Sequence, residues 1–168
     1  TKAEEGPTKR SAESFLQRGY GILEALTPPY KWASARDHFQ ESVDQLPSNA
    51  ASLYLLGMAE LELGRTTEAV ALMEKSLILD LDFKAPYVNL GVAYLRRQRF
   101  DQAIEVSEAC LKRHPESPQC HYHIGVACYQ KAQILEATMV GRLPERLKEI
   151  EALKTRASSE FSESRESE

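Results

Sequence analysis

The chain has 168 residues, of which 42% are hydrophobic and 27% charged, so it is long enough for one domain or one short repeat array with a core. Its 21 Lys and Arg against 25 Asp and Glu leave a net charge of −4, which offers no basic surface of the kind that nucleic-acid binding requires. No apolar run approaches the ~18 residues that cross a bilayer and no signal peptide is evident, so direct membrane insertion is not expected.

The first part of the chain is predicted to form two helices behind a flexible leader. Residues 1–10 are polar and contain Gly and Pro, which favours a leader without fixed structure. Ser11 is a candidate N-cap for a helix that continues on an apolar stripe to about residue 26. The Pro28-Pro29 pair interrupts the helical pattern, and a second helix is expected at 31–45.

Four helices separated by short turns are expected next. They span about 50–63, 67–79, 85–97 and 100–112, with breaks at turn residues such as Gly64 and Pro115. A longer helix is expected from about 118 to 139. No stretch alternates apolar and polar residues over more than a few positions, so strands are not predicted.

Three glycines, Gly57, Gly91 and Gly125, are evenly spaced along the chain, and each follows an apolar residue. An alanine stands at the same distance after each glycine, as Ala69 and Ala103 illustrate. A glycine inside a helix costs about 1 kcal/mol relative to Ala, so it is kept where a second helix crosses too closely for a Cβ. A fixed period of this length predicts stacked copies of one supersecondary unit.

Residues 84–115 carry the pattern most fully, in Tyr87, Leu90-Gly91, Tyr94, Ala103 and Pro115. This pattern resembles the tetratricopeptide repeat, a helix–turn–helix unit whose period equals the spacing of the glycines. The match departs at Ser107, where the family has Phe.

The resemblance implies an all-α fold, a right-handed solenoid of antiparallel helix pairs. It covers an array at 11–140, made of repeats at 15–47, 50–83 and 84–117 and a partial repeat at 118–140. The first repeat carries a short insertion around its Pro28-Pro29 pair.

The C-terminal part is expected to contain one further helix and a tail. Pro144 suits a first helical turn, and a helix within 141–157 would place Leu147, Ile150 and Leu153 on one side. We expect this C-terminal helix, at 141–157, to cap the open end of the stack. The alternative is that it completes a fourth repeat after an insertion. Residues 158–168 are rich in Ser and Glu and are predicted to be disordered.

The three cysteines, Cys110, Cys120 and Cys128, are odd in number and lack a Cys-x-x-Cys spacing, which argues against a disulfide framework. A reducing, cytoplasmic compartment is therefore predicted. Because the chain begins with Thr1, it is compatible with a processed or excised piece of a longer protein.

His114, Cys120, His121, His123 and Cys128 lie close together in the sequence. A metal site needs about four such ligands that converge on one point, and the helical spacing turns these side chains to different faces. No arrangement marks a nucleophile with its base. Neither a metal, a cofactor nor an enzymatic activity is predicted.

In the resembled family, the first helix of each pair lines a concave groove that holds ligands. Asn89 stands where many family members have an Asn that bonds the backbone of a ligand. The corresponding positions in this sequence are mainly apolar and aromatic, and they are Tyr54, Leu55, Met58, Val88, Asn89, Val92, Arg96, Gln119, Tyr122, His123, Val126 and Tyr129. The alternative is that the protein's own C-terminal helix covers them.

One branch of the family binds the acidic C-terminal tails of heat-shock chaperones through a clamp of Lys, Asn and Arg. Apart from Asn89, the places of that clamp hold Tyr54, Met58, Gln119 and His123, so such tails are not expected partners. The resemblance therefore implies an adaptor or co-chaperone-like scaffold that binds an apolar or amphipathic peptide or helix of a partner protein. The alternative is a structural subunit that assembles through its repeat edges or its C-terminal helix.

Overall fold

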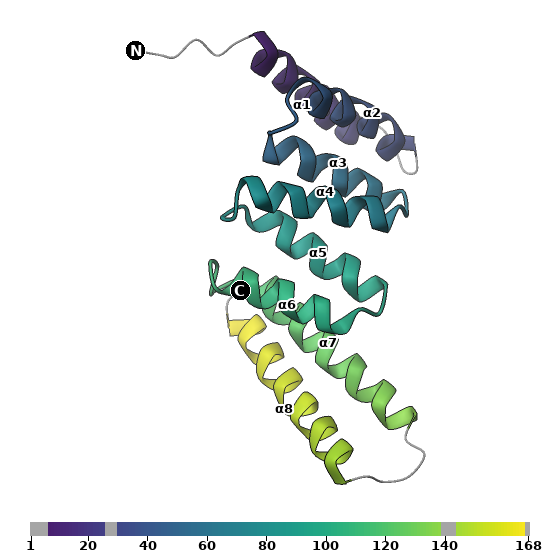
Figure 1. Cartoon of the computed structure of the whole chain (residues 1–168), viewed down its shortest axis with the longest axis vertical. Helices are drawn as coiled ribbons and strands as arrows, with labels where there is room; N and C mark the ends of the chain where they lie inside the picture. Colours follow the sequence, from purple (N-terminus) through teal and green to yellow (C-terminus); the bar gives the residue numbers. More distant parts are fainter. Residues whose placement is uncertain (1–6, 26–29, 139–143, 167–168) are drawn as a thin grey trace. The chain divides into compact units, whose positions relative to one another are not determined.

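The computed structural model describes residues 7–25, 30–138 and 144–166, and it contains eight helices and no strand within these ranges (Figure 1). The all-α fold is therefore as predicted. The helices are α1 (Pro7–Ala25), α2 (Tyr30–Gln45), α3 (Ala50–Glu62), α4 (Thr66–Leu79), α5 (Lys84–Arg96), α6 (Phe100–Leu111), α7 (Pro118–Ala137) and α8 (Pro144–Glu166).

The chain forms two compact units, Thr1–Pro86 and Tyr87–Glu168. In the first unit α1 packs on α2, α2 on α3 and α3 on α4, so consecutive helices are neighbours. In the second unit α6 packs on α7 and α7 on α8. Helix α8 lies alongside α7, its neighbour in the chain (Figure 1).

Local signals explain where the helices begin and end. The Asn49 side chain accepts a hydrogen bond from the Ser52 backbone N–H at 3.0 Å, which caps the start of α3. Gly64 adopts a positive φ of 82° in the turn between α3 and α4, a conformation that glycine reaches without steric cost. Pro118 occupies the first turn of α7, where its missing N–H removes no helical hydrogen bond.

The repeated glycines are sites of close helix crossing. A Cβ on Gly57 would lie 3.0 Å from Met73 Cγ of α4, and a Cβ on Gly19 would collide with the Phe39 ring of α2. A Cβ on Gly125 would lie 2.7 Å from the Phe161 ring of α8. At each of these three glycines, a large side chain from the second helix of the same pair therefore packs directly against the glycine backbone.

The pair of α7 and α8 follows the same packing rule as the earlier pairs. The Phe161 ring packs against the Cα of Gly125, as the Phe39 ring packs against the Cα of Gly19. Cys128 and Ile124 of α7 form a buried cluster with Ala157 of α8. Helix α8 thus packs on α7 through the same kind of glycine contact that joins α2 to α1.

Buried serines recur with the period of the repeat. Ser42 of α2 donates a hydrogen bond to the Ala12 carbonyl at 2.9 Å. Ser76 of α4, which stands at the equivalent place of the next repeat, donates to the Ala50 carbonyl at 2.8 Å. Both serines are fully buried, so these bonds satisfy hydroxyl groups that water cannot reach.

Both ends of the described chain are more helical than predicted. Helix α1 begins at Pro7, so residues 7–10 are not part of a flexible leader and Ser11 lies inside the helix rather than at its N-cap. Residues 1–6 lie outside the described residues. Helix α8 continues to Glu166, so the prediction of disorder is wrong for residues 158–166.

The predicted stripe of α8 is also only partly internal. Ile150 is 3% exposed and Leu153 packs on the core cluster of α7, but Leu147 is 41% exposed. The packed side of α8 extends instead toward its C-terminal end, through Ala157 and Phe161. Helix α7 ends at Ala137, two residues before its expected end at about residue 139, which lies outside the described residues.

Cys110 and Cys120 are joined by a disulfide, which corrects the prediction of three reduced cysteines. The bond links the end of α6 to the start of α7. Cys128 is free and buried, as expected for a small apolar side chain. The disulfide removes the ground on which a reducing, cytoplasmic compartment was predicted.

Candidate functional site

In the first unit, the predicted groove residues of α3 divide between its surface and its core. The Tyr54 hydroxyl donates to Met58 Sδ at 3.7 Å, and the Tyr54 ring meets the Phe83 ring edge-on, with centroids 5.0 Å apart. Tyr54 and Met58 are half-buried. Leu55 is 2% exposed and packs with Phe39, so it belongs to the core rather than to a binding surface.

In the second unit, the predicted residues of α5 form one strip along the helix. Val88, Val92 and Arg96 follow one another at intervals of four, which places them on one side of α5. Val88 and Val92 are half-buried, as is the adjacent Asn89, whereas Arg96 is exposed.

Helix α7 presents the most exposed part of the predicted surface. Tyr122 is 52% exposed and Tyr129 47%, and their separation of two helical turns puts both rings on one side of the helix. The half-buried Val126 stands between them. The Tyr129 hydroxyl accepts a hydrogen bond from Gln133 Nε2 at 2.9 Å, so its polar end is occupied while the ring stays open to solvent.

A hollow of about 220 Å³ lies at the start of this row of α7 residues. Its walls come from the first two turns of α7 and from the end of α8, and they are Pro118, Gln119, Tyr122, His123 and Ser164. The Phe161 ring of α8 lies 5.8 Å from the Tyr122 ring, yet half of Tyr122 remains exposed. Helix α8 therefore borders this surface without covering it.

His123 contributes to the wall of the hollow, but most of its side chain is buried, so it offers little surface to a ligand. It is 6% exposed, and its Nδ1 would lie 2.5 Å from a Cβ on Gly91. Burial lowers the pKa of His123, because the charged imidazolium is poorly solvated there. Ser107, which stands at the family's Phe place in α6, is too short to fill this crossing, and the His123 ring of α7 fills it instead.

Sequence reasoning missed a polar clasp between α7 and α8. His121 is 8% exposed, and its Nδ1 lies 2.8 Å from Glu160 Oε2 while its Nε2 lies 3.1 Å from the Pro115 carbonyl oxygen. A carboxylate and a carbonyl both accept hydrogen bonds, so the His121 ring donates to both at once only in its doubly protonated, imidazolium form. Glu163 Oε2 stands 3.7 Å from Nε2.

The pKa of His121 reflects these neighbours. Burial lowers the pKa, but the hydrogen bonds to Glu160 and to the Pro115 carbonyl, with the charges of Glu160 and Glu163, outweigh it and raise the pKa above its usual value. One sequence signal could have found the clasp. His121 stands where the preceding repeat has the apolar ring of Tyr87, and a buried imidazole at such a place needs a polar partner.

The cluster of His and Cys that the sequence singled out does not converge. Cys120 is bonded to Cys110, His121 binds Glu160 and His123 faces Gly91. Among the described residues, no three His, Cys, Asp or Glu side chains stand close enough together to hold a metal ion. Burial raises the pKa of the Cys128 thiol, which keeps that side chain in its unreactive form.

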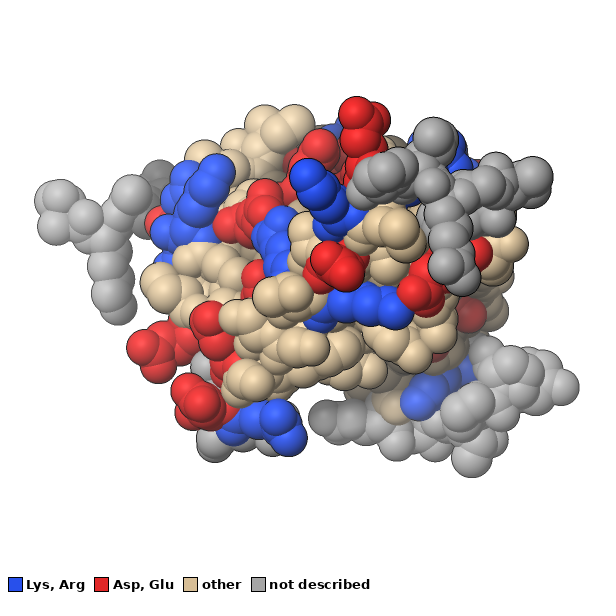
Figure 2. Space-filling model, turned by 90° about the horizontal axis from the view of Figure 1, so that it is seen from below, with Lys and Arg blue, Asp and Glu red and all other residues tan. Residues whose placement is uncertain are grey.

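Charge is mixed over the surface seen from below in Figure 2, where Lys and Arg alternate with Asp and Glu among uncharged groups. Such a surface lacks the single-signed field that guides a polyanion. Within the described ranges, none of the helices combines the length and the apolar character that spanning a bilayer requires.

Comparison with known proteins places this geometry in a family. A family model described as the tetratricopeptide repeat matches residues 31–82 and 88–144. No curated protein sequence matches the chain.

Solved structures show a similar fold. A crystal structure of MamA superposes with a TM-score of 0.73 at 19% identity, covering 93% of this chain and 77% of that one. The second tetratricopeptide repeat domain of human RPAP3, in complex with the HSP70 peptide SGPTIEEVD, gives 0.65 at 19% identity, covering 71% of this chain and 97% of that one. The first such domain of Spaghetti (RPAP3), bound to the HSP90 peptide SRMEEVD, gives 0.67 at 17% identity, with coverage of 73% and 94%. At these identities, the similarity concerns the fold alone.

Proposed function

Because this chain belongs to the tetratricopeptide repeat family, we propose that it is a protein–protein interaction module without catalytic activity of its own. It binds a segment of a partner protein on the open side of α7, the first helix of the last pair. Two structures of similar fold hold peptides of other proteins, which supports this mode of action.

The observation that carries the proposal is the open aromatic row of α7. Tyr122 and Tyr129 each expose about half of their surface, and they flank Val126 beside the hollow of about 220 Å³. Tyrosine rings supply large contact areas with little loss of conformational freedom, which is why they are enriched at binding hot spots. Packing within the unit does not explain this exposure, because α8 leaves both rings accessible.

The chemistry of the row favours an apolar or amphipathic segment as the ligand. The peptides named in the two RPAP3 structures end in acidic residues. In this chain, the clamp places of α7 hold the uncharged Gln119 and the buried His123, whose lowered pKa keeps it neutral. A carboxylate has no cation to pair with there. We therefore propose that acidic heat-shock tails bind this surface weakly.

The test compares two sets of substitutions on the same helix. Tyr122→Ala with Tyr129→Ala removes the aromatic row, whereas Ile134→Ala removes a side chain of α7 that is 42% exposed on another side. Partners are co-purified from the native source on the immobilised chain, and the affinity of the recovered partner is then measured. The double variant is expected to weaken binding at least tenfold, ~1.4 kcal/mol, while Ile134→Ala changes it little.

Thermal melting of both variants separates binding from folding. Retained affinity in a folded double variant would contradict the proposal, and so would an equal loss in Ile134→Ala.

A second candidate function is assembly into a larger complex through another surface, and its support lies at the end of α4. There Ile78 is 78% exposed and Leu81 51%, and loss of the partner on their replacement by Ser would favour assembly.

A further inference from the structure

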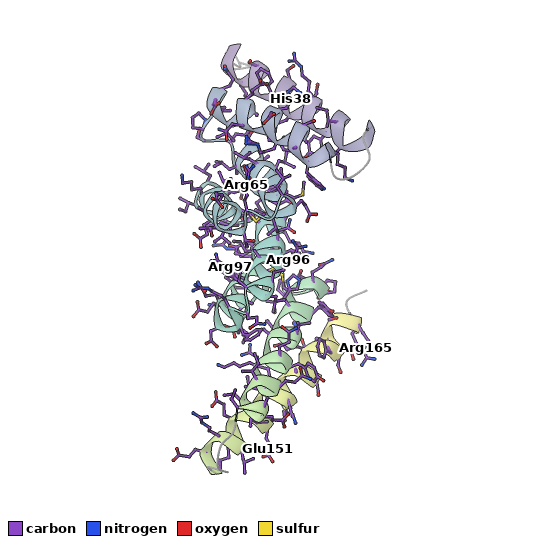
Figure 3. All side chains as sticks on the ribbon, turned by 90° about the vertical axis from the view of Figure 1, so that its right-hand side faces the viewer. His38, Arg65, Arg96, Arg97, Glu151 and Arg165 are labelled. Atoms are coloured by element: carbon purple, nitrogen blue, oxygen red, sulfur yellow. A yellow bond between two sulfur atoms is a disulfide. The ribbon has the colours of Figure 1, made fainter. Side chains whose placement is uncertain are left out.

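The polar clasp between α7 and α8 holds a part of α8 that has few apolar contacts. This end segment, residues 157–166, has two apolar side chains, Ala157 and the partly buried Phe161. Its other residues are serines, glutamates and one arginine, and most of them are exposed. A helix end that buries so little apolar surface is among the first parts of a protein to open. In Figure 3, Arg165 lies in the end segment and Glu151 in the first half of α8.

The first half of α8 is held on α7 independently of the clasp. Ile150 is buried, and Leu153 packs on the buried cluster of α7. Lys154 also forms an ion pair with Glu136 of α7 at 2.5 Å. The end segment can therefore leave α7 while the first half of the helix stays in place.

His121 completes the clasp only when both of its ring nitrogens carry hydrogen. Its partners are the Glu160 carboxylate at 2.8 Å and the Pro115 carbonyl oxygen at 3.1 Å, and both of them accept hydrogen bonds. A neutral ring has a single N–H, so one of the two contacts then sets a nitrogen lone pair against an oxygen lone pair. Loss of the proton therefore removes one hydrogen bond and the attraction between the two charges.

The charges around the imidazole ring of the clasp favour its protonated form. From α8, Glu160 and Glu163 face the ring at 2.8 Å and 3.7 Å. From the turn before α7, the neighbour is the uncharged Pro115 carbonyl. Arg156 of α8 binds the other oxygen of Glu160 at 3.5 Å and also binds Glu108 of α6, so it holds the carboxylate in place.

The pKa of His121 fixes the direction of the pH dependence. Burial lowers this pKa, but the hydrogen bonds and the two carboxylate charges raise it overall above its usual value of about 6.5. A raised pKa in the folded state means that the clasp is complete below about pH 6.5 and is lost as the pH rises through the folded value.

The end segment also borders the candidate binding surface. Ser164 lines the hollow of about 220 Å³, and the Phe161 ring lies 5.8 Å from the Tyr122 ring. The Phe161 ring also packs on Gly125. When the end segment leaves α7, the hollow loses one wall and the backbone at Gly125 is uncovered.

We propose that the end segment of α8 is a proton-dependent latch, which lies on α7 while His121 is protonated and leaves α7 when the proton is lost. Release extends the open side of α7 from Tyr122 toward Gly125, so the surface offered to a ligand changes with pH. The release itself depends on the clasp alone, whereas its effect on binding rests on the proposed function.

The free thiol of Cys128 reports the release. Cys128 is fully buried in the cluster that includes Ala157 of the end segment. Iodoacetamide, a small alkylating reagent, reaches this thiol when the end segment opens. The alkylation rate of the full chain is measured without a partner between pH 6 and pH 9. At each pH it is divided by the rate for the chain unfolded in urea, which removes the pH dependence of the thiol itself.

In the native chain, this rate ratio is expected to rise at least about tenfold from pH 6 to pH 9. His121→Gln should make the ratio independent of pH within about twofold, because an amide does not titrate in this range. The matched control is His38→Gln in α2, since His38 pairs with Glu41 on the surface at 3.3 Å, and it should keep the native profile.

Glu160→Gln gives a second, opposite test of the clasp. The amide of this variant accepts a hydrogen bond from a protonated His121 ring and donates one to a neutral ring. The end segment should therefore stay on α7 at pH 9, with a ratio as low as at pH 6. Glu145→Gln, at an exposed position in the first turn of α8, is the matched control and should open like the native chain.

Three results would overturn the latch. The first is a native ratio that changes less than about twofold over this pH range, and the second is a full rise in His121→Gln. The third is that Glu160→Gln opens at pH 9 as the native chain does. The affinity of the recovered partner at the two pH values tests the link to the surface, and equal affinities despite release would reject that link. The proposed function itself is decided by the variants of Tyr122 and Tyr129, so the two proposals fail separately.

Discussion

Replacing Gly125 with Ala tests whether α8 completes the last helix pair through Phe161. The added Cβ would lie 2.7 Å from Cε1 and 2.8 Å from Cδ1 of the ring, whereas carbon atoms in contact are about 3.5–4.0 Å apart. The ring must therefore move by about 1 Å, and overpacking of this kind costs about 1–3 kcal/mol. The higher helix propensity of Ala returns about 1 kcal/mol. Gly125→Ala should therefore destabilise the chain by about 0–2 kcal/mol.

The same substitution should have the opposite sign once the ring is absent. In a Phe161→Ala background nothing resists the new methyl group, so Gly125→Ala should stabilise by up to about 1 kcal/mol. Gly21→Ala in α1 is the matched control, because no atom lies within 4 Å of its added Cβ, and it should stabilise the native chain by a similar amount. Urea unfolding followed by circular dichroism measures all four variants.

A stabilising effect of Gly125→Ala that is equal in both backgrounds would refute this reasoning. It would mean that the end of α8 does not rest on α7 in solution. Gly57 provides a comparison with a smaller overlap, since a Cβ there would lie 3.0 Å from Met73 Cγ and 3.2 Å from the Ala69 carbonyl oxygen.

Three further predictions concern single polar or sulfur groups. Because the folded-state pKa of His121 is raised, its stabilising contribution is present below about pH 6.5 and is lost as the pH rises through the folded pKa. A pH series of melting temperatures should show this loss in the native chain and not in His121→Gln. Reducing the bond between Cys110 and Cys120, which stand 10 residues apart, should cost roughly 2–3 kcal/mol, measured as a fall in melting temperature with added thiol. Ser76→Ala should destabilise the chain by about 1–2 kcal/mol, because the Ala50 carbonyl loses its hydrogen-bond donor. Ser107→Ala should be neutral or stabilising, because the buried Ser107 hydroxyl has no hydrogen-bond partner. Unfolding curves that rank the two variants in the reverse order would contradict both assignments.

The order and bounds of the central helices could be predicted from the sequence because the local signals there agree with the repeat. Helices α2 to α7 begin and end close to the predicted positions. Gly64 and Pro118 mark the breaks directly, and the period of Gly57 and Gly91 places each helix relative to the next. Local propensity and tertiary packing specify the same elements in this part of the chain.

The end of the chain could not be predicted in this way, because its composition and its packing disagree. Residues 158–166 are mostly Ser, Glu and Arg, which is typical of disorder. Their helix is stabilised by a few contacts that sequence composition does not show, the Phe161 ring on Gly125 and the Glu160 carboxylate on His121. The available signal was Gly125 itself, because a glycine at this repeat position implies a second helix that packs a large side chain against it.

The candidate surface was predicted in outline but not residue by residue. The first helix of each pair has one open side, and the repeat pattern identified it well enough to find Tyr122 and Tyr129. It could not distinguish positions on the border between two helices. Leu55 and His123 stand at that border, and contacts with α2 and α5 bury them.

Two departures from the repeat in the second unit are linked to each other, and together they set the chemistry of the open side of α7. Ser107 stands where the family has a large side chain, so the His123 ring packs against Gly91 and is mostly buried. Losing a potential cation there leaves the open side of α7 aromatic rather than charged, which favours an apolar ligand.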